Sequence, residues 1–214
     1  MSSALLAVSI FDMSSRKRRR GPGRPTNPIS RSEILQTARV AFASKGYDGA
    51  STAYLAGQLG LTKGSLFHHF PSKENLYLEV MKQIFIEIGN MIEAAQLDDD
   101  SFRIRLRRLN SLVADYLGDN PAVASLLLQS QVLDTPLTSD SGRKPGIDLL
   151  HFAGGFLEAG MAAGEFRLQD SRHLLLSIIG CHLYYFATAP MTSELMECNI
   201  FAPEAVATRK EAVT

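Results

Sequence analysis

The chain has 214 residues, of which 45% are hydrophobic and 21% charged, and its formal net charge is zero. This composition is that of an ordinary globular protein and excludes a disorder-dominated or fibrous chain. The zero net charge hides a strong asymmetry, because residues 1–73 hold eleven Lys and Arg against three acids, so that this part carries +8 and the remainder −8. A basic first third joined to an acidic remainder indicates that one part contacts a polyanion while the other has a different task.

Residues 1–29 are rich in Arg, Pro, Gly and Ser and show no apolar periodicity after Met13, which predicts a flexible basic arm. The arm holds arginines of the kind that other proteins insert into a narrow, A·T-rich minor groove, namely Arg18, Arg19, Arg20 and Arg24. A generic charged tail is the alternative, but the closeness of the run to the first predicted helix favours a DNA-binding arm. The apolar stretch 4–11 precedes the basic cluster, which is the wrong order for a secretory signal, and Met13 is an alternative start.

Ordered structure is expected from Ser30, where Ser30 and Glu33 have the spacing of a capping box and apolar residues follow at helical intervals until Gly46. A second, short helix is predicted to begin at Ser51 or Thr52 and to end at Gly60. Thr62 can then cap a third helix that runs to about Phe70. Two short helices separated by a tight glycine-containing turn are typical of a helix-turn-helix motif.

Ser72 is the predicted cap of a long amphipathic fourth helix that runs to about Gln96. Further helices are predicted at about 101–117, 121–133, 146–163, 170–189 and 203–213. No segment alternates with period two and no internal repeat is present. The sequence therefore predicts an all-α fold: the arm (1–29), a three-helix DNA-binding domain (30–75), and a helical ligand-binding and dimerisation domain (76–214) that the long helix joins to it.

The stretch from Ser51 to Leu76, STAYLAGQLGLTKGSLFHHFPSKENL, resembles the DNA-binding signature of the TetR family of transcriptional regulators. The resemblance covers residues 30–80 and rests on the coincidence of turn, helix caps, aromatic cluster and Ser-Lys-Glu. Residues 201–205, FAPEA, are similar to a C-terminal segment of some members. The resemblance implies a cytoplasmic regulator, most commonly a repressor that a small-molecule ligand releases from its operator.

On a helix that begins at Lys63, Leu66 and Phe70 lie four residues apart and can bury against the first two helices. Lys63 and Ser65 are then free to reach base edges in the major groove, while the small Gly64 lets the backbone approach the DNA. Contacts to phosphate are expected from Thr62, His68, His69 and Lys73. The family resemblance adds DNA-contact roles for Thr52 and Phe67.

Two positions depart from the usual family pattern. Phe67 stands where tyrosine is common, so a hydroxyl contact to phosphate is lost, and Ala53 is too short to reach a base. The alternative roles are surface or metal-binding histidines for His68 and His69, and a core role for Phe67. Neighbouring histidines on a helix point apart and no cysteine or acid completes a site nearby, so we expect no metal.

The second half of the chain is expected to form a helix bundle that either packs solidly or encloses a ligand cavity. Five polar side chains in apolar surroundings are candidates to orient a ligand: Gln129, His151, His182, Tyr184 and Tyr185. Gln131 belongs to the same class. A satisfied polar residue of the core is the alternative for each of them.

The apolar helix at 170–189 and the helix at 203–213 resemble the pair that forms a four-helix dimer interface in the family. A two-fold homodimer would place its recognition helices about 34 to 36 Å apart, which matches successive major grooves of a palindromic operator. A ligand would then act by favouring a dimer whose spacing no longer fits.

The apolar run 174–189 is shorter than a membrane span and predicts a buried helix, so no membrane partner is expected. Cys181 and Cys198 suit reduced thiols, with Cys181 as a buried apolar residue and redox sensing as the alternative. An enzyme is the first rival class, but the sequence has no phosphate-binding glycine loop, Gly-x-Ser-x-Gly motif or metal-spaced cluster, so neither catalysis nor a cofactor is expected. A protein-interaction module, the second rival, leaves the basic first third unexplained.

Overall fold

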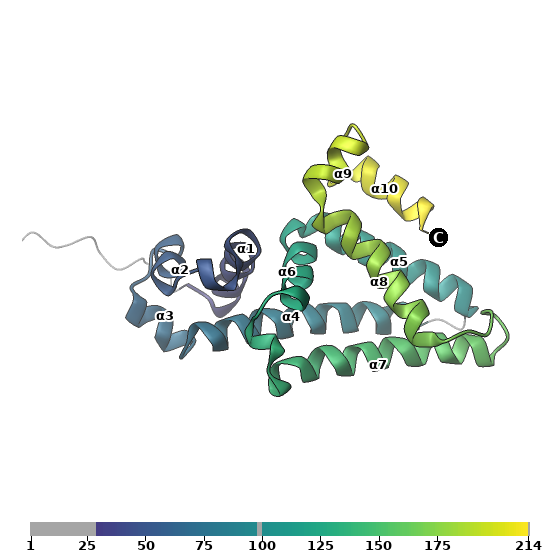
Figure 1. Cartoon of the computed structure of the whole chain (residues 1–214), viewed down its shortest axis with the longest axis horizontal. Helices are drawn as coiled ribbons and strands as arrows, with labels where there is room; N and C mark the ends of the chain where they lie inside the picture. Colours follow the sequence, from purple (N-terminus) through teal and green to yellow (C-terminus); the bar gives the residue numbers. More distant parts are fainter. Residues whose placement is uncertain (1–28, 98–99, 214) are drawn as a thin grey trace, which may run out of the picture.

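The computed structural model describes residues 29–97 and 100–213. Within these residues the chain is helical throughout, which confirms the predicted all-α fold (Figure 1). The helices in chain order are α1 (Arg31–Gly49), α2 (Thr52–Gln58), α3 (Lys63–His69), α4 (Lys73–Ala94), α5 (Phe102–Asp119), α6 (Pro121–Val132), the 3₁₀ turn η1 (Pro136–Thr138), α7 (Asp140–Ala162), α8 (Ser171–Ala187), α9 (Ala189–Leu195) and α10 (Pro203–Ala212).

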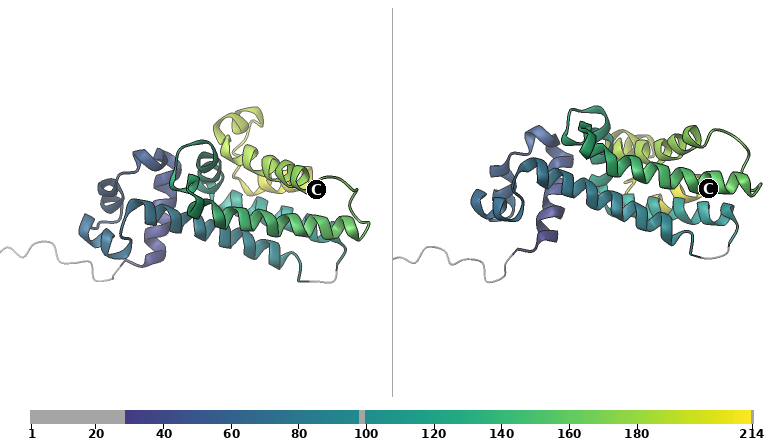
Figure 2. Two further views of the ribbon diagram at one scale, coloured as in Figure 1. Left: turned by 60° about the horizontal axis from the view of Figure 1, so that its bottom comes forward. Right: turned by 90° about the horizontal axis from the view of Figure 1, so that it is seen from below.

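The helices form two groups that α4 connects. Helices α1 to α3 gather around the first part of α4, and the later helices surround its second part, with α7 running beside it (Figures 1 and 2). One continuous hydrophobic core runs through both groups, from Ile34 of α1 to Val206 of α10. Because α1 packs against α4 and α6, the position of the small N-terminal group is set by the body of the protein.

Each of the first four helices begins at the cap that the sequence predicts. Ser30 and Glu33 form both halves of a capping box, and the hydroxyls of Ser51, Thr62 and Ser72 each accept a bond from the backbone N–H three residues later. Gly46 and Gly60 adopt positive φ angles of 70° and 63°, which explains why glycine stands at these positions. The helix does not end at Gly46 as predicted, because the three residues after this kink form a further helical turn.

The predicted start of the helix at residue 146 is wrong, because α7 begins at Asp140. The Ser139 hydroxyl accepts a hydrogen bond of 3.1 Å from the Gly142 N–H and so caps a helix that contains Pro145. Pro145 lies in the second turn, where it removes only the bond to the carbonyl of Ser141, an exposed residue that water can reach. The proline therefore does not mark the boundary.

The predicted buried helix at 170–189 differs from the structure in two ways. It ends at Ala187, and the unpredicted helix α9 follows after a bend of 84°, with Pro190 in its first turn. It is also not buried on all sides, since Leu176 is 61% and Tyr184 59% exposed. Cys181, expected to be buried, is exposed as well.

Among the described residues, no individual helix has the length and apolar composition of a membrane span; helices α8 and α9 meet that criterion only as a bent pair.

Phe102, Phe156 and Phe166 pack against one another beside Gly160 of α7. A Cβ at this buried glycine would overlap the Phe166 ring and lie 3.2 Å from the Phe102 Cβ. Gly160→Ala is therefore expected to destabilise the protein by about 1–3 kcal/mol. Gly155→Ala, on the same helix but facing open space, is expected to stabilise it by about 0.5–1 kcal/mol. Thermal unfolding of both variants measures the difference, and equal effects would contradict this packing.

Candidate nucleic-acid interface

Helix α3 divides its side chains as the sequence predicts. Leu66 and the following Phe70 are buried in the core, whereas Lys63, Gly64 and Ser65 are exposed. Phe67 is 39% exposed, which excludes the alternative of a purely core residue. The helix thus presents one polar, accessible face whose direction is fixed by two buried anchors.

The turn before α3 holds its first residues in place. The Thr62 hydroxyl accepts a hydrogen bond of 3.1 Å from the Ser65 N–H and lies 2.9 Å from the Ser65 hydroxyl. The predicted phosphate and base contacts of these two side chains would therefore form beside the cap bond, since a hydroxyl has one donor and two acceptor positions. In α2, Thr52 is the first residue and half-buried.

The two histidines at the end of α3 have their rings close together. Their ring centroids are 6.0 Å apart in an edge-to-face arrangement, with His68 exposed and His69 half-buried. In the described part of the chain, no group of three or more His, Cys, Asp or Glu side chains is placed to hold a metal ion.

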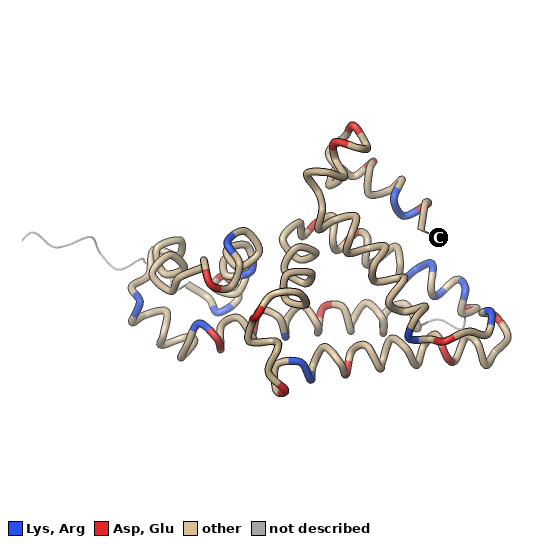
Figure 3. Tube along the Cα trace, in the orientation of Figure 1, with Lys and Arg blue, Asp and Glu red and all other residues tan. Residues whose placement is uncertain are grey.

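The Lys73 ammonium, predicted to contact phosphate, already has a partner within the protein. Its ammonium donates a hydrogen bond of 3.0 Å to the Tyr47 carbonyl and lies 4.2 Å from the centroid of the Tyr47 ring. Because an ammonium has three donors, a phosphate contact is compatible with this arrangement. Figure 3 shows that basic positions of α1, α3 and the start of α4 belong to the same end of the molecule. The arm residues Arg18, Arg19, Arg20 and Arg24, and the alternative starts Met1 and Met13, lie outside the described residues.

Sequence reasoning missed Arg31, which ties the start of α1 to the end of α3. Its guanidinium donates a hydrogen bond of 3.0 Å to the His69 carbonyl, lies 4.2 Å from the Phe70 ring centroid and pairs with Glu79 at 3.3 Å. The sequence offered no signal for this role, because an arginine at a helix start looks like any surface charge. Arg31 thus connects α1, α3 and α4 at the end of the recognition helix.

The five predicted ligand residues do not converge on one site. Gln129 donates a hydrogen bond of 2.9 Å to the Ala43 carbonyl of α1, and His151 and Tyr184 are exposed. Only His182 and Tyr185 are buried; the Arg209 guanidinium lies 4.5 Å from the Tyr185 ring centroid.

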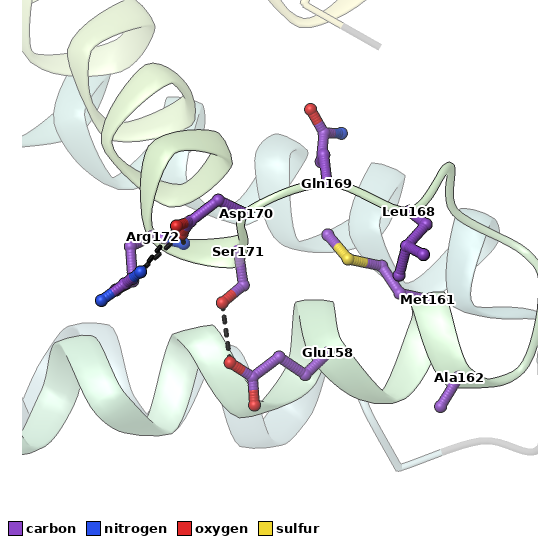
Figure 4. A pocket seen from close by; sticks show the side chains of 8 residues that line it. All are labelled: Glu158, Met161, Ala162, Leu168, Gln169, Asp170, Ser171 and Arg172. Carbon is purple, nitrogen blue, oxygen red and sulfur yellow. Dashed lines mark hydrogen bonds and ion pairs between the residues drawn. The ribbon is translucent and has the colours of Figure 1, made fainter.

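A surface hollow of about 600 Å³ lies where α7 and the start of α8 meet (Figure 4). It is lined by Glu158, Met161, Ala162, Leu168, Gln169, Asp170, Ser171 and Arg172, a set that includes none of the predicted ligand residues. Its polar groups bond to one another, Ser171 to Glu158 and Arg172 to Asp170, each at 2.7 Å. Two of its polar pairs are therefore already bonded within the protein.

His182 is held in its neutral form. It is 5% exposed, and its Nε2 lies 3.3 Å from the Asn110 Oδ1. Burial, assisted by the nearby Arg209 charge, lowers the pKa of His182 to about 4. Within the described residues its Nδ1 is buried without a hydrogen-bond partner, which is consistent with a neutral ring.

This lowered pKa predicts loss of stability in acid. The unfolded histidine binds a proton below about pH 6.5 whereas the folded one resists protonation down to about pH 4, so stability falls as the pH drops through this window. The expected loss between pH 7 and pH 5 is about 2 kcal/mol. Chemical denaturation at both pH values measures it, with His182→Gln as the control that lacks a titrating group. An equal loss in the control would contradict the assignment.

The geometry defines a class: a helix-turn-helix module with one accessible helix face, joined by a long helix to a larger helical body. Comparison with known proteins gives the particular family. Residues 34–80 match the family model of bacterial regulatory proteins of the tetR family, and residues 103–214 match that of the tetracyclin repressor-like C-terminal domain. Since the second match alone covers more than half of the chain, the protein belongs to the TetR family of bacterial regulators.

Individual relatives agree with this assignment. The repressor AcnR of Corynebacterium glutamicum is 47% identical over 60 residues, which are 28% of this chain and 31% of AcnR. The chain thus matches about a third of the length of this curated relative. The crystal structure of the TetR family regulator PfmR of Thermus thermophilus superposes with a TM-score of 0.66 at 25% identity, over 87% of this chain and 96% of PfmR. Bacillus subtilis FadR, solved with stearoyl-CoA, has the same fold, with a TM-score of 0.63 at 19% identity over 86% of this chain and 97% of FadR.

Proposed function

We propose that this protein is a sequence-specific DNA-binding repressor that binds a palindromic operator as a homodimer in the cytoplasm and is released by a small-molecule ligand. The observation that carries the proposal is the exposed face of α3, where Lys63, Gly64 and Ser65 are exposed while Leu66 and Phe70 anchor the helix. A helix presented in this way fits the major groove, where lysine and serine read base edges.

Other residues near this face are expected to contact the phosphate backbone. These contacts hold the helix in register while the base contacts choose the sequence. The phosphate contacts are proposed for Thr62, His68, His69 and Lys73. Thr52 and the apolar ring of Phe67 add further DNA contacts, and Arg18, Arg19, Arg20 and Arg24 of the arm enter the minor groove.

A homodimer is supported by the exposed face of α8. Leu176 and Tyr184 are more than half exposed, and Ser177, Gly180 and Cys181 between them are exposed and small. Small side chains let two helices approach closely, so that a second copy can cover the apolar residues. An oligomeric state measured by analytical ultracentrifugation tests this part, and a monomer at micromolar concentration would contradict it.

Ligand-controlled release is the second part of the proposal. FadR of this fold was solved with stearoyl-CoA, and in this chain the facing helices α7 and α8 carry half-buried apolar residues such as Leu149, Leu175 and Ile178. Tyr184 belongs to the face proposed for the dimer, whereas His151, His182 and Tyr185 on these helices are proposed as ligand contacts. Their substitution is expected to raise the ligand concentration needed for release without changing DNA affinity. A ligand that binds but leaves operator affinity unchanged at fixed salt would contradict this part.

The direct test of DNA binding is a gel-shift titration on the intergenic DNA beside the protein's own gene, repeated at several salt concentrations. The variant Lys63→Ala, Ser65→Ala is expected to lose discrimination against competitor DNA by about tenfold or more, because each good base contact contributes about 1–3 kcal/mol. Lys144→Ala is the matched control, since Lys144 is exposed on α7 and pairs only with Asp148 among the contacts that the structure gives it. No shift at low salt would overturn the proposal. We propose no catalytic role for any residue of this chain.

A further inference from the structure

Helix α1 is joined to the body by a polar network around one carboxylate. Arg39 of α1 is only 3% exposed, and its Nη2 donates to both oxygens of Glu87 of α4 at 2.9 and 3.0 Å. The hydroxyl of Tyr116, on α5, donates to the same carboxylate. Three helices from both parts of the molecule therefore meet on the Glu87 side chain.

A second polar bond joins α1 to α6. The Gln129 side-chain amide donates a hydrogen bond of 2.9 Å to the carbonyl of Ala43. Ala43 lies three residues before Gly46, where φ of 70° and ψ of 172° break the helix. Gln129 thus holds α1 next to its kink, one turn beyond Arg39.

These contacts suit the positioning of a helix better than the stabilisation of the fold. The free energy that a buried ion pair gains from its attraction barely offsets the cost of removing both charges from water. Apolar residues of similar size therefore stabilise the fold as well or better. What a carboxylate with two donors adds is direction, since hydrogen bonds weaken steeply when their angles change. Burial raises the pKa of the Tyr116 hydroxyl, with the Glu87 bond adding to the effect, so it keeps the proton that it donates.

Helix α1 can pass its position on to the recognition helix. Through Arg31 it donates to the His69 carbonyl at the end of α3, and it packs against α2. A displacement of α5 or α6 in the body would pull on Glu87 or Ala43 and turn α1, and α3 would turn with it. The contacts of Glu87 and Gln129 with α1, and of Arg31 with α3, thus connect the body to the DNA-reading face.

We infer that Arg39, Glu87, Tyr116 and Gln129, here called the junction network, are positioning residues that set the angle of the DNA-reading helices against the body. The inference rests on the proposed DNA-binding function and deepens it, because the angle in each protomer fixes the distance between the two recognition helices of a dimer. While its hydrogen bonds are intact, the junction network keeps the two recognition helices at the distance that the operator requires. When these bonds break, that distance is no longer fixed.

The test measures affinity for a set of operators whose half-sites are at the natural spacing or one base pair closer or farther apart. Tyr116→Phe removes one hydroxyl and keeps the ring. Glu87→Gln replaces the shared carboxylate by a neutral amide with one acceptor oxygen, and Gln129→Ala removes the bond to Ala43. Tyr116→Phe and Glu87→Gln are expected to reduce the preference for natural over altered spacing about tenfold, the factor that loss of a hydrogen bond to a charged group represents. Gln129→Ala loses a bond between neutral groups and is expected to reduce it about fivefold. Lys144→Ala, in an exposed ion pair on α7, is the control expected to keep the full preference.

The outcomes separate the inference from the function on which it rests. A wild-type protein that binds no operator, or binds all spacings equally, overturns the proposed function. A wild type with a sharp preference and variants that keep it overturns the junction network alone. Variants that lose affinity equally at every spacing, with lower thermal stability, have a merely structural defect and also overturn it. Only a selective loss of spacing preference in folded Tyr116→Phe protein supports it.

Discussion

Deletion of residues 1–26 is expected to weaken operator binding at 50 mM salt and to flatten its salt dependence, by about a thousandfold per protomer between 50 and 200 mM. The run from Arg16 to Arg24 holds six of the eleven basic residues in the first third of the chain. If all six neutralise phosphates, their loss reduces the slope of log affinity against log salt by about 5 per protomer. Fluorescence anisotropy between 50 and 200 mM salt measures the slope.

Two control proteins isolate the basic run. Deletion of residues 1–12 keeps it and starts the chain at Met13, so wild-type affinity and slope are expected. Replacement of the six basic residues by serine keeps the length and is expected to reproduce the full effect of the deletion. An unchanged slope in the serine variant would show that the run is a generic charged tail.

Phe42→Ala is expected to destabilise the protein by about 3–5 kcal/mol, because it leaves a cavity in a closely packed site. Phe42 is fully buried on α1, with its ring centroid 5.0 Å from that of Tyr77 and 6.1 Å from that of Tyr47. This aromatic cluster joins α1 to the start of α4. Chemical denaturation measures the loss.

The same substitution at Phe67 is expected to affect operator binding and to leave stability nearly unchanged. Phe67 is 39% exposed on α3, so Phe67→Ala is expected to change stability by less than about 1 kcal/mol while it weakens operator binding. A large stability loss at Phe67, or none at Phe42, would show that the interface and the core have been assigned wrongly.

The sequence predicted local structure well wherever a local interaction determines it. The caps at Ser30, Thr62 and Ser72 form within one turn, so their residue types and spacing suffice to place the helix starts. The start of α7 was placed too late because the cost of Pro145 inside a helix depends on whether the freed Ser141 carbonyl is exposed, which the sequence alone does not show. Helix α9 was not predicted, although Pro190 in its first turn is a residue that favours the start of a helix.

The candidate interface was predictable in part. The outward face of α3 follows from helical periodicity and two buried anchors, whereas the partner of a charged side chain depends on the packing of distant helices. Arg39 illustrates the difference. It lies one turn from Leu35 and next to the buried Ala38, and an arginine on such an apolar face is a usable sign of a buried ion pair. Nothing local identifies Glu87 as that partner. Gln129 was predicted to face a ligand and instead contacts α1.

Selection of bound fragments from random-sequence DNA tests the central claim most directly. Full-length protein is expected to enrich a palindrome of two half-sites about 34 to 36 Å apart, or one helical turn of DNA. Under the same conditions, Ser65→Ala is expected to enrich a palindrome of the same spacing in which the preference at one base pair of each half-site is relaxed. Failure of the wild-type protein to enrich any sequence, or enrichment of the same motif with the same preference at every position by both proteins, would contradict the account.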